Sequence, residues 1–129
     1  MSFPYLTNGT VIHGYKRGSK ELGFPTANLD IEIPKLEDGV YYGYSILNNE
    51  PKEKMVMSIG TNPQYGNNHR SYEVHILKKY DEDFYGEELE IMIMGKIREM
   101  TKFDSLDGLI DAINQDIEYA KKMLTLEKN

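Results

Sequence analysis

Cysteine is absent from this sequence. Its absence excludes a disulfide framework, a thiolate metal site and a cysteine nucleophile, and it fits a reducing compartment. The sequence also has no apolar run of roughly 18 to 20 residues, the length that a helix needs to cross a bilayer. The first residues form neither a basic region nor an apolar stretch, so no secretory signal is expected. We therefore expect a cytoplasmic protein with no membrane partner.

Positive charge is scarce, because 15 Lys and Arg stand against 21 Asp and Glu, which gives a net charge of −6. A nucleic-acid partner requires a basic surface, so the charge argues against a nucleic-acid binder, including one of the OB type. The chain has 129 residues, 40% of them hydrophobic, which is enough to bury one core. It has no internal repeat and no long linker, and we expect a single domain over residues 1–129.

Short apolar runs separated by turn residues occupy the first four-fifths of the chain. They predict strands over residues 10–14, 39–47, 54–59, 71–78 and 88–97. The second of these segments is rich in tyrosine and ends at two asparagines, a turn signal. Several short strands at this spacing indicate a closed or nearly closed antiparallel sheet.

The period of the apolar residues changes in the last part of the chain. One stripe at helical spacing is formed by Leu106, Leu109, Ile110, Ile113, Ile117, Ala120 and Leu124. Asp104 or Ser105 can cap the first turn. We expect this helix to pack on the barrel and to close its open side, so the fold class is mainly β with a C-terminal helix.

The segment 14–28 is rich in glycine and cations near its start. Three glycines and three cations lie within ten residues, among them Gly14, Lys16, Gly18 and Lys20. Glycines let backbone N–H groups approach an anion, and the lysines add positive charge, so the segment could bind a phosphate. It lacks the spacing of a Walker loop. A solvated surface loop fits the same composition.

Thr26 and Asn28 follow Pro25 and lie two residues apart. If the proline leads into a strand, both side chains point to one face and present two neutral oxygens. Such a sparse set suits magnesium, which takes its other ligands from phosphates and water. The alternative is an ordinary turn in which the Asn28 side chain bonds its own backbone.

Glu73 lies in the middle of a predicted strand. Alternation places Tyr72, Val74 and Ile76 on one face and Glu73 on the other. A carboxylate among apolar residues is costly to bury without a partner. Glu73 is therefore an exposed carboxylate, a partner of the nearby Arg70, or a general base for a hydroxyl proton.

The loop between the last strand and the helix contains two residues suited to a ligand. Arg98 could reach an anion, and Phe103 could stack on an aromatic ligand. Phe103 could equally pack against the start of the helix as a hydrophobic staple.

Six collinear motifs resemble those of the riboflavin kinase family over most of the chain, from about Gly9 to Leu124. The first motif is Arg17-Gly18-Ser19-Lys20 together with the stretch 22–28 that follows it, which ends in the Pro-Thr-Ala-Asn signature. Further matches are Gly39-Val40-Tyr41-Tyr42-Gly43, Ser58-Ile59-Gly60-Thr61-Asn62-Pro63, Tyr72-Glu73-Val74-His75-Ile76, Asp83-Phe84-Tyr85-Gly86 and Phe103-Asp104-Ser105-Leu106.

The resemblance implies a six-stranded antiparallel Greek-key barrel with a C-terminal helix. It implies transfer of the γ-phosphate of ATP to the 5′-hydroxyl of riboflavin, which gives FMN and ADP. It implies Mg²⁺ as the metal, with Zn²⁺ or Mn²⁺ as alternatives, and it fits a monomer. Because nothing precedes Met1, FAD synthesis is not expected. The alternative class is a barrel that binds flavin or nucleotide without catalysis.

The resemblance also implies residue roles. Glu73 matches the catalytic base, and Thr26 and Asn28 match the residues that hold the metal beside the ATP phosphates. The nucleotide would contact Gly14, Lys16, Gly18, Ser19, Lys20, Thr26, Asn28 and Tyr85. The flavin would contact Arg98, Met100 and Phe103.

This chain departs from the family pattern at several positions. The family usually has proline and then often glutamate after the arginine of the flavin loop, where this chain has Glu99 and Met100. A frequent histidine after the catalytic strand is Lys78, and a frequent tryptophan is Thr61. These departures concern closure of the flavin loop and contacts to adenine rather than the core chemistry.

Overall fold

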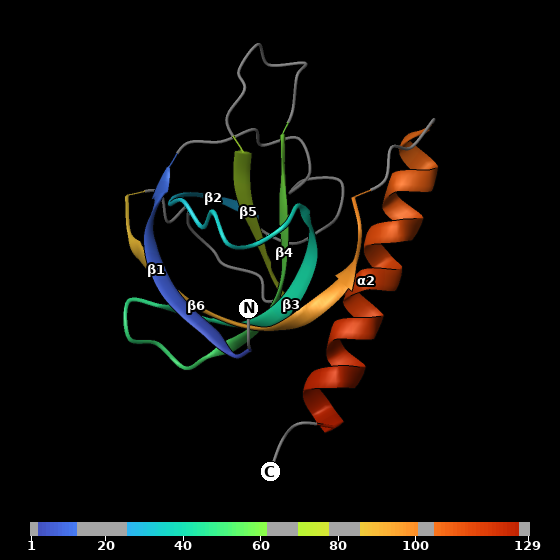
Figure 1. Ribbon diagram of the computed structural model, residues 1–129. Helices are drawn as coiled ribbons and strands as arrows, with labels where there is room; N and C mark the ends of the chain where they lie inside the picture. The colour runs from blue at the N-terminus through green and yellow to red at the C-terminus, as the bar shows by residue number, and fades with distance from the viewer. Residues whose placement is uncertain (1–2, 13–25, 62–69, 78–85, 101–104, 127–129) are drawn as a thin grey trace.

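The computed structural model of the chain describes residues 3–12, 26–61, 70–77, 86–100 and 105–126. Six strands close into an antiparallel barrel, and one long helix lies against its outside (Figure 1). The elements are β1 (Tyr5–Ile12), β2 (Thr26–Asp30), β3 (Gly39–Leu47), β4 (Glu53–Thr61), β5 (Arg70–Ile76), β6 (Glu88–Arg98) and α2 (Leu106–Leu126).

The strands follow one another around the barrel in the order β1-β2-β5-β4-β3-β6. Strands β3, β4 and β5 pair in sequence, and β6 returns to lie beside β3. This arrangement is a Greek key, in which the fourth strand lies next to the first. Pairing of β1 with both β2 and β6 closes the sheet, so no strand is left as an unpaired edge. The predicted Greek-key barrel with a C-terminal helix is confirmed.

Local sequence explains the tightest connections. Asn48 and Asn49 both have positive φ, at 50° and 64°, which is the conformation of a tight turn between antiparallel strands such as β3 and β4. Gly43 lies where β3 approaches β6 closely, and a Cβ there would collide with the carbonyl oxygen of Met92. The register of the β3–β6 pairing shifts between Tyr42 and Gly43, so glycine permits the irregularity.

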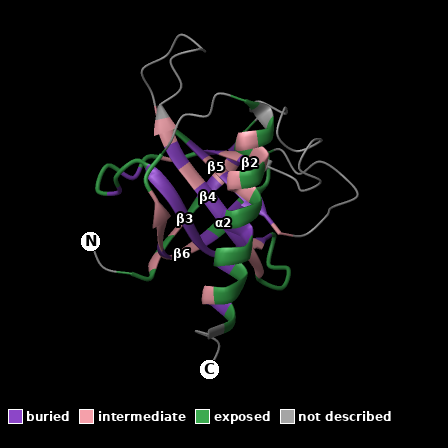
Figure 2. Ribbon diagram, turned by 90° about the vertical axis from the view of Figure 1, so that its right-hand side faces the viewer, coloured by how far each residue is buried: buried purple, intermediate pink, exposed green. Residues whose placement is uncertain are grey.

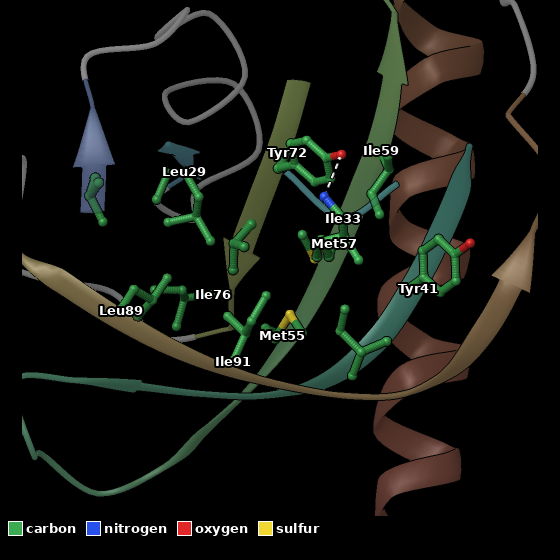
Figure 3. Close-up of a cluster of buried hydrophobic side chains, with 14 of the residues drawn as sticks. Leu29, Ile33, Tyr41, Met55, Met57, Ile59, Tyr72, Ile76, Leu89 and Ile91 are labelled. Atoms are coloured by element: carbon green, nitrogen blue, oxygen red, sulfur yellow. Dashed lines mark hydrogen bonds between the residues drawn. The ribbon is translucent and has the colours of Figure 1, made fainter. Parts of the chain in front are cut away.

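The interior of the barrel is apolar. Alternate residues of all six strands contribute to it, including Leu29, Tyr41, Met57, Ile76 and Ile91 (Figure 3). The phenol of Tyr72 accepts a hydrogen bond of 2.9 Å from the backbone N–H of Ile33, so its one polar atom is satisfied inside the core.

A second apolar cluster lies on the outside of the barrel under α2. Its buried members are Val40, Tyr42, Val56, Ile117, Ala120 and Leu124. The opposite side of the helix is exposed along its length (Figure 2). Ser105 caps the helix, because its hydroxyl accepts a 3.1 Å hydrogen bond from the backbone N–H of Gly108. Within the described residues, no helix combines the length and the apolar character that crossing a membrane requires.

The predicted elements differ from the observed ones mainly at their ends. Strand β1 begins at Tyr5, five residues earlier than the apolar run at 10–14 predicts. Its first half carries Thr7, Asn8 and the exposed Leu6, so composition gives little strand signal there. Pairing with β6 forms these residues into a strand nonetheless.

Candidate active site

Glu73 lies on the outer face of the barrel, in the centre of a row of cross-strand neighbours. Its Cα partners are Asn28 on β2 and Ser58 on β4. Its chain neighbours Tyr72 and Val74 are buried in the barrel interior, so strand alternation directs Glu73 outwards. The predicted alternation of β5 is thus confirmed, and it brings a carboxylate, an amide and a hydroxyl together.

The Glu73 carboxylate is distinguished by its burial and by having no partner in the part of the chain that the structure describes. Burial raises its pKa above the ordinary value of 4.5. Among the described residues, no hydrogen bond or ion pair reaches it. The interpretation that Arg70 pairs with Glu73 is wrong, because the Arg70 guanidinium donates to Asp38 at 2.8 Å and to the carbonyl oxygens of Ile33 and Leu36.

Arg70 instead fixes the connection between β2 and β3. Its three hydrogen bonds end on residues of that connection, and its exposed surface is small. The Arg70 cation therefore has a structural role, and among the described residues it does not supply a positive charge to Glu73. A half-buried carboxylate with no countercharge in the described part of the chain is often a residue that takes part in binding or catalysis.

Asn28 and Thr26 lie on the strand next to Glu73. Ala27 between them is fully buried in the barrel interior, which directs the neighbouring Asn28 to the outer face. The backbone of Thr26 pairs with His75, while its side chain lies outside the described atoms. The amide oxygen of Asn28 and the carboxylate of Glu73 are hard oxygen donors, so the donor chemistry fits a divalent cation such as Mg²⁺.

His75 lies two residues after Glu73, on the same side of β5, and is buried. Burial lowers its pKa from 6.5 to about 4, so the imidazole is neutral near pH 7. A neutral ring cannot serve as the countercharge of Glu73.

Two of the three residues predicted at the flavin loop belong to the described chain. The guanidinium of Arg98 forms two 2.9 Å hydrogen bonds with the carboxylate of Asp116 on α2. Met100 is 47% exposed, and its side chain lies over Gly60 of β4. Asp116 was missed by the sequence interpretation, although a carboxylate beside Ile117, within the apolar stripe, was a visible signal.

The remaining predicted site residues lie outside the described residues. They are Gly14, Lys16, Gly18, Ser19, Lys20, Tyr85 and Phe103. Their proposed contacts with nucleotide and flavin therefore stay predictions.

The family model described as Flavokinase, riboflavin kinase, matches residues 1–124. This chain belongs to the riboflavin kinase family. Riboflavin kinase from Homo sapiens is 45% identical over 131 residues, which cover 98% of this chain and 84% of that protein. The family resemblance stated from the motifs is thereby confirmed, and the chain is an enzyme of the riboflavin kinase class.

Two solved structures share the fold. Riboflavin kinase from Trypanosoma brucei aligns with a TM-score of 0.74 at 28% identity, over 97% of this chain and 83% of that one. A macrolide-efflux protein from Streptococcus pneumoniae aligns with a TM-score of 0.77 at 33% identity, over 92% of this chain. The alignment spans only 38% of the latter protein, so the likeness concerns one part of it.

Proposed function

We propose that this enzyme transfers the γ-phosphate of Mg-ATP to the 5′-hydroxyl of riboflavin, with Glu73 as the general base. The observation that supports the proposal is the half-buried Glu73 carboxylate, which has a raised pKa and no partner among the described residues. A base for a hydroxyl proton must have a free lone pair and reach the attacking oxygen directly. A carboxylate already held in an ion pair would meet neither condition.

The step balances as a simple phosphoryl transfer. The 5′-oxygen of riboflavin forms a bond to the γ-phosphorus, and the bond from that phosphorus to the bridging oxygen of ATP breaks. The hydroxyl proton passes to Glu73, and ADP leaves with the electron pair of the broken bond. The raised pKa brings the carboxylate closer to the operating pH, which favours proton acceptance.

Asn28 and Thr26 would hold the divalent cation beside Glu73. A cation bound there supplies positive charge that neutralises the phosphate oxygens as the phosphoryl group moves. Asn28 is neutral, so most of the charge of the cation stays available to the phosphates. The preferred metal is proposed to be Mg²⁺, with Zn²⁺ or Mn²⁺ as alternatives.

The other assignments complete the proposal. Residues 14–20 and Tyr85 would bind the nucleotide, and Arg98, Met100 and Phe103 would contact the flavin. We further propose that the enzyme works as a cytoplasmic monomer. Exclusion of water by the loops over both substrates would prevent hydrolysis of ATP.

The direct test incubates the protein with riboflavin, ATP and a divalent cation and measures FMN by chromatography. Glu73→Gln removes the base while keeping the shape, so turnover should fall by roughly two or more orders of magnitude. The matched control is Glu90→Gln, which makes the same chemical change at an exposed position of β6 and should leave turnover unchanged. Normal turnover of Glu73→Gln would remove it as the base.

A barrel that binds flavin or nucleotide without catalysis is the alternative. It predicts that riboflavin quenching titrations show binding while no FMN forms with any divalent cation. Formation of FMN by the unaltered enzyme, lost in Glu73→Gln and kept in Glu90→Gln, excludes it.

A further inference from the structure

Asp116 occupies a position on α2 where an apolar residue is expected. The helix places Ile113, Asp116, Ile117 and Ala120 on the side that packs on the barrel. Asp116 is 4% exposed, the same fraction as Ile117 beside it. Removing a carboxylate from water costs several kcal/mol of folding free energy unless the carboxylate is paired. A buried leucine at the same position would not have this desolvation cost. The charge at this place therefore calls for an explanation beyond packing.

The partner of Asp116 is Arg98, the last residue of β6. Arg98 Nε donates to Oδ1 and Nη2 donates to Oδ2, both at 2.9 Å, so the contact is a bidentate fork. Arg98 Nη1 also donates to the carbonyl oxygen of Glu99 at 3.2 Å. A planar guanidinium held at both ends has one orientation, which gives the contact geometric precision that an apolar pair lacks.

The pair joins the two ends of the segment 99–115. This segment comprises the loop after β6 and the first half of α2. Of its apolar side chains, Leu109 is 37% exposed and Ile113 is half-buried, whereas Leu124 in the second half of the helix is fully buried. Apolar packing therefore holds the second half of α2, and the Arg98–Asp116 pair ties the middle of the helix to the end of β6 by a charged, bidentate contact.

Met100 shows where this segment rests. A Cβ built on Gly60 would lie 3.3 Å from the terminal methyl of Met100 and 3.9 Å from its sulfur, so the methionine covers this glycine. Gly60 lies two residues after Ser58 on β4, and the Cα partner of Ser58 is Glu73. Met100, two residues after Arg98, therefore lies beside the row that contains the proposed base.

We infer that Asp116 is a positioning residue for the reaction. By fixing the Arg98 guanidinium, it sets where Met100 and the first half of α2 lie relative to Glu73, and thus how the flavin hydroxyl is presented for attack. The inference rests on the proposed function. Positioning matters in phosphoryl transfer because most of the rate comes from in-line placement of the reacting atoms.

The test separates positioning from fold stability with the double variant Arg98→Met with Asp116→Leu. Replacing both charges by apolar groups of similar volume is often neutral or stabilising, so the midpoint of unfolding should be kept. We expect kcat/KM for riboflavin to fall roughly tenfold to a hundredfold. The KM for ATP should stay within about twofold, because Arg98 and Asp116 lie on β6 and α2, whereas the proposed metal ligands lie on β2. Kinetic constants equal to those of the unaltered enzyme would overturn the inference.

A pair of conservative variants provides the matched control. Arg98→Lys and Arg70→Lys each keep the charge but lose the guanidinium fork, and each arginine fixes a loop to the barrel. Only Arg98→Lys should raise the KM for riboflavin. An equal change in Arg70→Lys would assign the effect to a loosened fold and would contradict the inference.

A measurement of riboflavin binding in the absence of turnover tests this inference independently of the proposed function. Quenching of riboflavin fluorescence in the presence of ADP and Mg²⁺ gives a dissociation constant that does not depend on Glu73. Weaker binding in the double variant, with Glu73→Gln binding normally, supports the positioning role whatever the identity of the base. If the double variant binds riboflavin normally and kcat is also unchanged, Asp116 has only a structural role.

Discussion

The two faces of β5 differ in what they bury. The inner face contributes Tyr72, Val74 and Ile76 to an apolar core whose only polar atom on this strand, the Tyr72 hydroxyl, is hydrogen-bonded. The outer face presents Glu73 and His75, two buried or half-buried titratable groups whose pKa values burial shifts. The same strand thus stabilises the fold on one side, and on the other it keeps groups whose burial costs stability. Such a cost is expected where the groups serve catalysis.

The largest effect on stability should come from the inner face. Ile76→Ala removes a fully buried side chain and leaves a cavity in the closed barrel, so the free energy of unfolding should fall by about 2 to 5 kcal/mol. Urea denaturation measures the change. A loss below about 1 kcal/mol would mean that the inner face of β5 does not stabilise the fold as this comparison of the two faces requires.

His75 should make stability depend on pH. Its folded pKa of about 4 lies below its ordinary value of 6.5, so the unfolded chain takes up the proton first. Above pH 6.5 the imidazole is neutral in both the folded and the unfolded chain. As the pH falls from 6.5 towards 4, the free energy of unfolding should decrease, by about 3 kcal/mol in total. Unfolding of the unaltered enzyme and of His75→Gln across this range measures the difference. Parallel pH profiles for the two proteins would contradict the burial of a neutral imidazole.

The proposed metal ligands Thr26 and Asn28 can be tested by measuring the affinity for the nucleotide. Thr26→Ala with Asn28→Ala removes the proposed oxygen ligands, so the affinity for Mg-ADP should fall by roughly tenfold or more, while affinity for ADP without metal should change little. Calorimetric titration with and without Mg²⁺ gives both values. Asn8→Ala is a suitable control, because this exposed amide of β1 donates its side-chain hydrogen bond to Glu88, on a strand other than β2.

Glu73→Gln, on the outer face of β5, should have the smallest effect on stability. Unlike Ile76→Ala on the inner face, it should raise the free energy of unfolding. The folded pKa of Glu73 lies above the ordinary value, so its stabilising contribution is complete only below that value and is lost as the pH rises through the folded pKa. At neutral pH the charged carboxylate therefore destabilises the fold. The glutamine variant should be more stable by roughly 0.5 to 2 kcal/mol while it loses turnover. A variant less stable than the parent would show that Glu73 has a structural partner.

Sequence alone predicted much of the fold, because the signals are local. Strand alternation placed Glu73 opposite Tyr72 and Val74, the paired asparagines marked the β3–β4 turn, and Ser105 was one of two proposed helix caps. Strand β2 could only be proposed conditionally. It is five residues long and depends on pairing with β1 and β5 rather than on its own composition.

Sequence by itself also determined the family, since the collinear motifs around Glu73 and the Pro-Thr-Ala-Asn signature can be recognised without a structure. It could not determine which groups form pairs. Arg70 is three residues from Glu73 yet binds Asp38, and Arg98 binds Asp116, a partner that the sequence did not suggest. Tertiary structure decided both partners, because strand order and register choose which of several nearby charges a guanidinium can reach. The row of Asn28, Glu73 and Ser58 has the same origin, since hydrogen bonding between strands distant in the chain brings these residues together.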